Sequence, residues 1–141
     1  MKKLNSIITL IALLLISCSL DYKNNTEVDH DNVMVRIAEI EIEAEHLEEY
    51  LAILKKEAEA SVRLESGVIC IYPMYQKENP TQIRLLEIYS NKEAYESHLQ
   101  TPHFKHYKTT TLPMVKDLRL VEMEALNSET IPMIFTKLNK K

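Results

Sequence analysis

Apolar and polar positions divide the chain after residue 32 into four strand-like and three helix-like segments. Residues 33–44 alternate in their second half, with Ile40 and Ile42 on one face and glutamates on the other, which is the period of a strand. Residues 46–65 place apolar side chains at helical spacing with charged ones between them, so they predict an amphipathic helix of about five turns. In chain order, the pattern predicts strands at 33–44, 68–76, 82–89 and 119–124 and helices at 46–65, 92–100 and 103–115.

This order of elements predicts a domain of the α+β class with the ferredoxin-like split βαβ arrangement. Pro73 lies inside the second strand and therefore indicates an edge position or a bulge. Gly67, the only glycine of the chain, follows the first helix, and we expect it to form a helix C-terminus of the glycine type. Residues 90–91 can cap the second helix, whereas Thr101-Pro102 should end it and begin the third.

The two middle strands are apolar on both faces, so each face needs a cover. The helices can cover one face, and a second subunit would cover the other. We therefore expect a homodimer that buries Ile69, Ile71 or their strand neighbours between two sheets.

The first 32 residues differ from the rest of the chain. Residues 1–17 begin with two lysines and continue with an apolar run that is too short to span a bilayer, which predicts a secretory signal. Leu15-Ile16-Ser17-Cys18 resembles the lipobox of bacterial lipoproteins, which implies acylation of Cys18 and an exported, membrane-anchored protein. Polar residues 18–32 then predict a tether, residues 33–124 one domain, and residues 125–141 an extension whose fold the pattern does not predict.

Charge and cysteine content limit the function classes. Residues 1–17 contain two lysines and no acid, so the chain without them has a formal charge of −6 instead of −4. This acidic balance, without a basic cluster, argues against a nucleic-acid partner. Cys70 would have no disulfide partner in the mature chain, and its apolar neighbours indicate a buried, inert strand residue. A single glycine also excludes a glycine-rich dinucleotide fingerprint.

Three short motifs resemble the antibiotic biosynthesis monooxygenase (ABM) family. They are Arg-Ile-Ala-Glu-Ile at 36–40, Glu-Ile-Tyr at 87–89 and His-Leu-Gln-Thr-Pro-His-Phe-Lys-His-Tyr at 98–107. The resemblance covers residues 33–124, and the Thr-Pro-His segment is most similar to the quinol monooxygenase and autoinducer-2 phosphate isomerase branches. The family implies a homodimer in which two sheets face each other in an α+β barrel, with a small-molecule pocket in each subunit. Several members oxidise phenols or quinols without metal or flavin, so the resemblance implies no cofactor here.

The haem-degrading branch of the same family fits less well. Its strand asparagine falls on Ile40, its tryptophan on Tyr89 and its haem-ligating histidine on Lys108, although His106 lies close by. Haem degradation is therefore not expected.

His98 and His103 are the candidate catalytic residues. A cofactor-free oxygenase must deprotonate its phenolic substrate, and histidine is the side chain that changes charge near neutral pH. His98 lies four residues after Ala94, on a face whose residues suit the interior. Both histidines could instead form structural hydrogen bonds at helix ends.

Five further residues are candidates for substrate binding. Four of them are apolar or aromatic residues that could line a pocket or simply fill the core, namely Tyr72, Met74, Tyr89 and Tyr107. Arg36 shares a strand face with Ala38 and Ile40, so it could hold an oxygen anion in the cavity or lie at a solvated strand end.

The spacing of His98, His103 and His106 raises the question of a metal site. Pro102 separates the first histidine from the other two, and no nearby carboxylate has ligand spacing, so the sequence predicts no metal. The functions that remain are a monooxygenase acting on a small aromatic or quinol, an isomerase of phosphorylated signals and a non-catalytic binding lipoprotein. Export argues against the isomerase, whose substrate would be cytosolic.

Overall fold

Four antiparallel strands form one sheet in the order β2-β3-β1-β4. The computed structural model describes residues 32–127 and 129–139, so the predicted signal and Cys18 lie outside it. The strands are β1 (Met34–Ile42), β2 (Val68–Tyr75), β3 (Gln82–Tyr89) and β4 (Val115–Met123). This strand order is that of the ferredoxin-like split βαβ arrangement, which confirms the predicted fold class.

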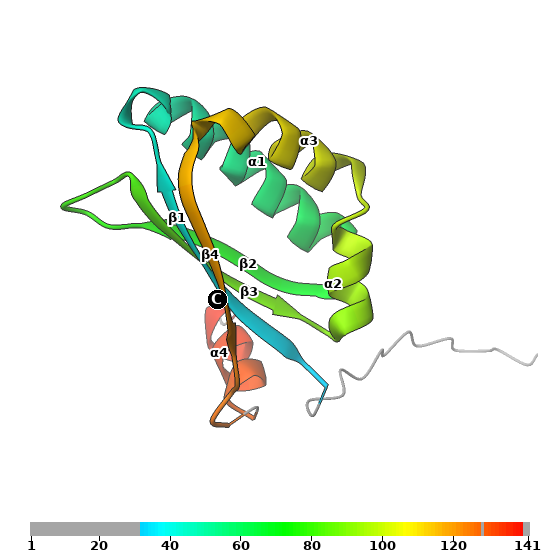
Figure 1. Cartoon of the computed structure of the whole chain (residues 1–141). Coiled ribbons are helices and arrows are strands. Elements are labelled where there is room, and N and C mark those ends of the chain that lie inside the picture. Colours follow the sequence, from blue (N-terminus) through cyan, green and yellow to red (C-terminus); the bar gives the residue numbers. More distant parts are fainter. Residues whose placement is uncertain (1–31, 128, 140–141) are drawn as a thin grey trace, which may run out of the picture.

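Three helices cover one face of this sheet. α1 (Leu47–Leu64) and α3 (Pro102–Thr111) lie side by side over the strands, and α2 (Lys92–His98) stands at one end of the sheet (Figure 1). Short 3-10 turns, η1 (Ala44–His46) and η2 (Leu112–Met114), precede α1 and β4.

Side-chain caps fix where α2 and α3 begin, as the sequence predicts. The Asn91 side chain accepts a hydrogen bond of 2.8 Å from the backbone N–H of Ala94. The Thr101 hydroxyl accepts one of 3.3 Å from the backbone N–H of Phe104, and Pro102 occupies the first turn of α3.

The core lies between the sheet and the helices, because alternate strand residues face that side. Every second residue of β1 from Arg36 to Ile42 is buried. Tyr50 and Leu54 of α1 pack against this face and are almost fully buried. Burial of one such large apolar side chain contributes roughly 1.5–3 kcal/mol.

A bulge in β2 decides which of its residues face the core. β2 is an edge strand, which confirms the interpretation of Pro73. Val68 pairs with Tyr89 and Cys70 with Ile88, so the register shifts between Val68 and Cys70. Because the extra residue reverses the alternation, Ile71 faces the core and is only 7% exposed. Helices of its own subunit therefore bury Ile71, which corrects the expectation for this residue; a contact through its strand neighbours stays a prediction.

The opposite face of the sheet presents apolar side chains to solvent. Tyr72, Met74 and Met123 on this face are 60%, 40% and 49% exposed. The chain ends in α4 (Thr130–Leu138), which lies below the strands on the side away from α1 and α3 (Figure 1). Met133, Ile134 and Leu138 of α4 are also exposed. Within residues 32–127 and 129–139, no helix combines the length and apolar character that crossing a membrane requires.

Gly67 is explained by close packing and not by backbone conformation. Its φ is not positive, so the expected glycine-type helix end is wrong. A methyl group at this position would lie 2.5 Å from Cβ of Ala94 and 3.3 Å from the Ser90 hydroxyl. The absence of a side chain therefore lets the α1–β2 connection lie against the start of α2.

Replacement of Gly67 by alanine should consequently destabilise the domain. Overpacking of this kind typically costs about 1–3 kcal/mol, measured as the free energy of unfolding in urea. Ala94→Gly removes the opposing methyl group but costs about 1 kcal/mol of helix propensity by itself. The double variant should be more stable than the sum of the two single effects predicts. Strict additivity, or a fully stable Gly67→Ala variant, would contradict the packing argument.

Candidate active site

A cavity of about 310 Å³ lies between the helix-facing side of the sheet and helices α1, α2 and α3. This volume is at the lower end of the range typical of small-molecule sites, roughly 300–1,000 Å³. Leu118 and Leu120 of β4 line the cavity and are about half exposed, at 53% and 48%. The cavity therefore opens along the β4 edge of the sheet.

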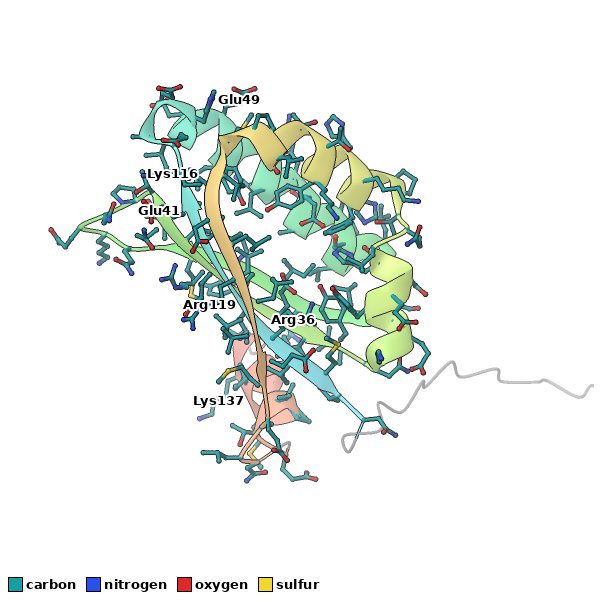
Figure 2. The ribbon with its side chains drawn as sticks, in the orientation of Figure 1. Arg36, Glu41, Glu49, Lys116, Arg119 and Lys137 are labelled. Atoms are coloured by element: carbon teal, nitrogen blue, oxygen red, sulfur yellow. The ribbon has the colours of Figure 1, made fainter. Side chains whose placement is uncertain are left out.

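Four of the seven predicted catalytic and substrate-binding residues line this cavity. They are Arg36, Tyr89, His98 and Tyr107. They come from β1, β3, α2 and α3, so the fold brings together side chains from four elements. Arg36 extends from β1 toward the helices, whereas Arg119 lies on the other side of the sheet (Figure 2).

The other three predicted residues lie outside the cavity wall. Tyr72 and Met74 project from the opposite face of the sheet, because the bulge in β2 reverses its alternation; their assignment to the pocket is wrong. His103 lies behind the wall, beside Glu65. The cavity is lined by Lys108, whereas His106 is exposed and does not line it.

The buried His98 is held by a carboxylate. His98 lies in the last turn of α2 and is 2% exposed. Its Nδ1 lies 2.9 Å from Oε1 of Glu65, and Nε2 of His103 lies 2.6 Å from the same oxygen. Burial by itself raises the pKa of Glu65. The hydrogen bonds from His98 and His103 lower this pKa by more than burial raises it, so the net shift is downward. The ionised carboxylate only accepts hydrogen bonds, so both imidazoles must donate to it.

This hydrogen bond also fixes the tautomer of His98. A neutral imidazole that donates from Nδ1 has its lone pair on Nε2. Nε2 lies 3.7 Å from Oε1 of Glu57, which is beyond hydrogen-bonding distance. His98 is therefore a buried residue of the cavity wall with an oriented proton acceptor.

Glu57 is a buried carboxyl group on the inner face of α1. The Ser61 hydroxyl donates a hydrogen bond of 2.8 Å to its Oε1. Burial raises the pKa of Glu57, and the Ser61 hydrogen bond and the neighbouring His98 only partly oppose this. Glu57 therefore stays protonated up to a higher pH than an ordinary glutamate does.

Arg36 provides positive charge on the sheet side of the cavity. Its guanidinium group lies 4.3 Å from the centre of the Tyr95 ring, and one of its terminal nitrogens is 3.2 Å from Oε1 of Glu122. Its buried Nε has no hydrogen-bond partner among the described residues. Tyr89 donates a hydrogen bond of 3.2 Å to Glu87, whose pKa burial raises.

A pair of tyrosines provides hydroxyl groups at the helix side. The hydroxyls of Tyr50 and Tyr107 are 2.6 Å apart, and the two rings meet edge to face. Burial raises the pKa of Tyr50 to about 12 and also raises that of Tyr107. Both residues therefore remain protonated near neutral pH and can orient an oxygen atom, but they do not act as bases.

Three acidic residues at the site were not predicted from the sequence as functional residues, namely Glu57, Glu65 and Glu87. Glu87 shares the inward face of β3 with Leu85 and Tyr89, so strict alternation could have placed it in the cavity. Glu57 lies seven residues after Tyr50 on the apolar stripe of α1, which is also a detectable signal. Glu65 gives no such signal, because its partners lie 33 and 38 residues away in sequence.

Together these groups can remove a proton from a small, mostly apolar molecule and hold the resulting oxygen anion. Nε2 of His98 is the acceptor, Arg36 supplies positive charge, and the tyrosine hydroxyls donate hydrogen bonds. Because the wall contains many apolar side chains, these electrostatic interactions are stronger than they would be in water.

Comparisons with known proteins agree with this geometry. The model of the family "Antibiotic biosynthesis monooxygenase" matches residues 33–110. A Bacteroides thetaiotaomicron protein, described as a proposed antibiotic biosynthesis monooxygenase, is 49% identical over 70% of this chain and 93% of its own, with a TM-score of 0.69. A proposed monooxygenase from Lactobacillus acidophilus is 31% identical over 67% of this chain but 45% of its own, with a TM-score of 0.65. No functionally curated protein matches the chain.

More distant structures share the fold alone. One from Nitrosomonas europaea is 20% identical over 67% of this chain and 91% of its own, with a TM-score of 0.64. The family match covers more than half of the chain and includes the strands and helices that carry His98, Arg36 and Tyr107. The chain therefore belongs to the antibiotic biosynthesis monooxygenase family.

Proposed function

We propose that this protein is a cofactor-independent monooxygenase that acts on a small phenol or quinol. The observation that carries the proposal is His98: a buried imidazole whose Nδ1 is held by Glu65 and whose ring lines the cavity. A phenolate donates electrons to oxygen far more readily than a phenol does, so deprotonation is the step that such a site must provide.

The proposed reaction balances without an added reductant. A quinol loses its hydroxyl proton to Nε2 of His98 and transfers electrons to O₂. One oxygen atom enters the ring and the other leaves as water, so quinol plus O₂ gives a hydroxyquinone plus H₂O. The four electrons that reduce O₂ all come from the substrate.

The alternatives place different demands on the cavity. A phosphorylated sugar would bring two negative charges beside the carboxyl groups of Glu57 and Glu87, whereas a phenolate brings one. A non-catalytic binding protein would need an apolar cavity but no oriented base. The cavity charges therefore argue against the phosphorylated substrate, and the Glu65–His98 hydrogen bond argues against a non-catalytic role.

His98→Ala should lower quinol-dependent oxygen consumption by about 10²–10⁴-fold, the usual contribution of a general base. Glu65→Gln should also lower turnover, because the amide can donate to Nδ1 and so permits the wrong tautomer. The measurement is oxygen uptake by purified protein, without added metal or flavin, across a panel of quinols. His106→Ala is the matched control, since this histidine is exposed and outside the cavity.

Two results would contradict the proposal. The first is unchanged turnover in a folded His98→Ala variant. The second is absence of oxygen uptake across the whole panel, together with an apolar ligand recovered from the native protein, which would favour the binding lipoprotein.

We further propose that two copies pack through the exposed face of the sheet. Tyr72 and Met74 of β2 and Met123 of β4 expose apolar side chains at the two edges of this face, outside the helix layer, and a second sheet could cover them. Tyr72→Glu should therefore convert a dimer to a monomer in sedimentation experiments, while leaving thermal unfolding cooperative. A wild-type monomer at micromolar concentration would exclude this interface.

Finally, we propose that the domain is exported and anchored to a membrane through an acylated Cys18. Quinols reside in membranes, so a lipid anchor would bring the cavity close to its substrate. The full-length chain should partition into detergent, and Cys18→Ala should release it or block its processing. Identical fractionation of the two proteins would exclude the anchor.

A further inference from the structure

Three donor atoms from three helical segments converge beside the cavity. Oε1 of Glu65 at the end of α1 is 2.9 Å from Nδ1 of His98 and 2.6 Å from Nε2 of His103. All three atoms lie within 4.8 Å of one another. Two imidazoles and one carboxylate form a donor set that suits zinc, with ligand distances of about 2.0–2.2 Å.

The surroundings of His98 provide a second, independent observation. A histidine that binds a metal through one nitrogen usually donates its other N–H to a carboxylate or carbonyl group. Oε1 of Glu57 lies 3.7 Å from Nε2 of His98, and Ser61 holds this oxygen in place with a 2.8 Å hydrogen bond. A small side-chain movement would therefore bring this oxygen within hydrogen-bonding distance of a metal-bound His98.

The three ligands differ in exposure in a way that allows an ion to enter. The side chains of His98 and Glu65 are 3% and 12% exposed, whereas that of His103 is 21% exposed. An ion would therefore approach from the His103 side and would retain water in its remaining coordination position. Since the donor atoms are now close enough to share hydrogen bonds, binding requires only small side-chain movements.

We propose that Glu65, His98 and His103 bind one divalent transition-metal cation, for which Zn²⁺ is the best match, and that this ion withdraws His98 from proton transfer. Coordination uses the lone pair of Nδ1, so the imidazole proton moves to Nε2. Nε2 then donates toward Glu57 and can no longer accept a proton from a substrate. Metal binding itself does not depend on the proposed monooxygenase activity; its inhibitory effect does.

The chain contains a matched cluster that should not bind the ion. Nitrogen atoms of His46 lie 3.7 Å from Glu45 and 4.0 Å from Glu49, but these glutamate side chains are 81% and 62% exposed. Glu45 and His46 are neighbours in sequence, and no second histidine joins this cluster among the described residues. His46→Ala is therefore the control for non-specific association of zinc with surface histidines.

The binding test is competition for Zn²⁺ between the full chain and a chromophoric chelator. We expect one equivalent of Zn²⁺ to bind. Loss of a residue that only hydrogen-bonds to a metal ligand typically weakens binding by roughly 10–100-fold. His103→Ala and Glu65→Gln each remove a ligand, so each should weaken binding by more than that. Glu57→Gln should weaken it within that range, and His46→Ala should leave it unchanged. Co²⁺ bound to the wild type should show the visible absorption of a four-coordinate site. Thermal unfolding of each variant verifies that it is folded.

Two outcomes would overturn the site: zinc affinity that is the same in the wild type and in a folded His103→Ala variant, or loss of binding in His46→Ala. His103 is partly exposed at the start of α3, so this variant tests the site even if Glu65→Gln does not fold. One equivalent of Zn²⁺ should also suppress quinol-dependent oxygen uptake in the wild type but not in His103→Ala. If no quinol is oxidised, the proposed function fails while the binding data still decide the site.

Discussion

The Glu65 carboxylate is the interaction on which the arrangement of the helices depends. It lies at the end of α1 and accepts hydrogen bonds from His98 of α2 and His103 of α3, so one oxygen atom joins three helices. Because these groups are largely removed from water, loss of one partner leaves the others unsatisfied and costs more than the hydrogen bond contributes. The same contact orients His98 toward the cavity, and stability and chemistry therefore depend on the same residues.

Most of the fold follows from local sequence periodicity. Strand β3 and helix α1 agree with the predicted ranges to within a residue or two, because their buried faces repeat with periods of 2 and 3.6. β4 begins at Val115 and not at residue 119, since an exposed edge strand carries polar residues such as Lys116 on both faces. α4 was not predicted because it is only nine residues long and has Pro132 in its first turn.

The site was less predictable because its geometry depends on long-range contacts. Arg36 and Tyr89 could be placed by alternation alone, since β1 and β3 are regular where they pair. Tyr72 could not, because a single extra residue between Val68 and Cys70 reverses the face, and this residue, Ile69, is itself typical of a regular strand. The sequence around His98 does not indicate Glu65 as a partner, because only the fold brings the end of α1 next to α2.

The charges around the cavity restrict its occupant more strongly than its size does. Burial raises the pKa values of Glu57 and Glu87, because removal from water disfavours their charged forms. In the proposed reaction, a singly charged phenolate forms only as its proton moves to His98, which leaves an imidazolium beside it. The pair then adds no net charge to the cavity. A ligand that arrives as a phosphate dianion brings its charge with it and must be desolvated next to two carboxyl groups. These charges therefore support the proposal of a substrate that enters neutral, such as a phenol or quinol, over that of a phosphate ester.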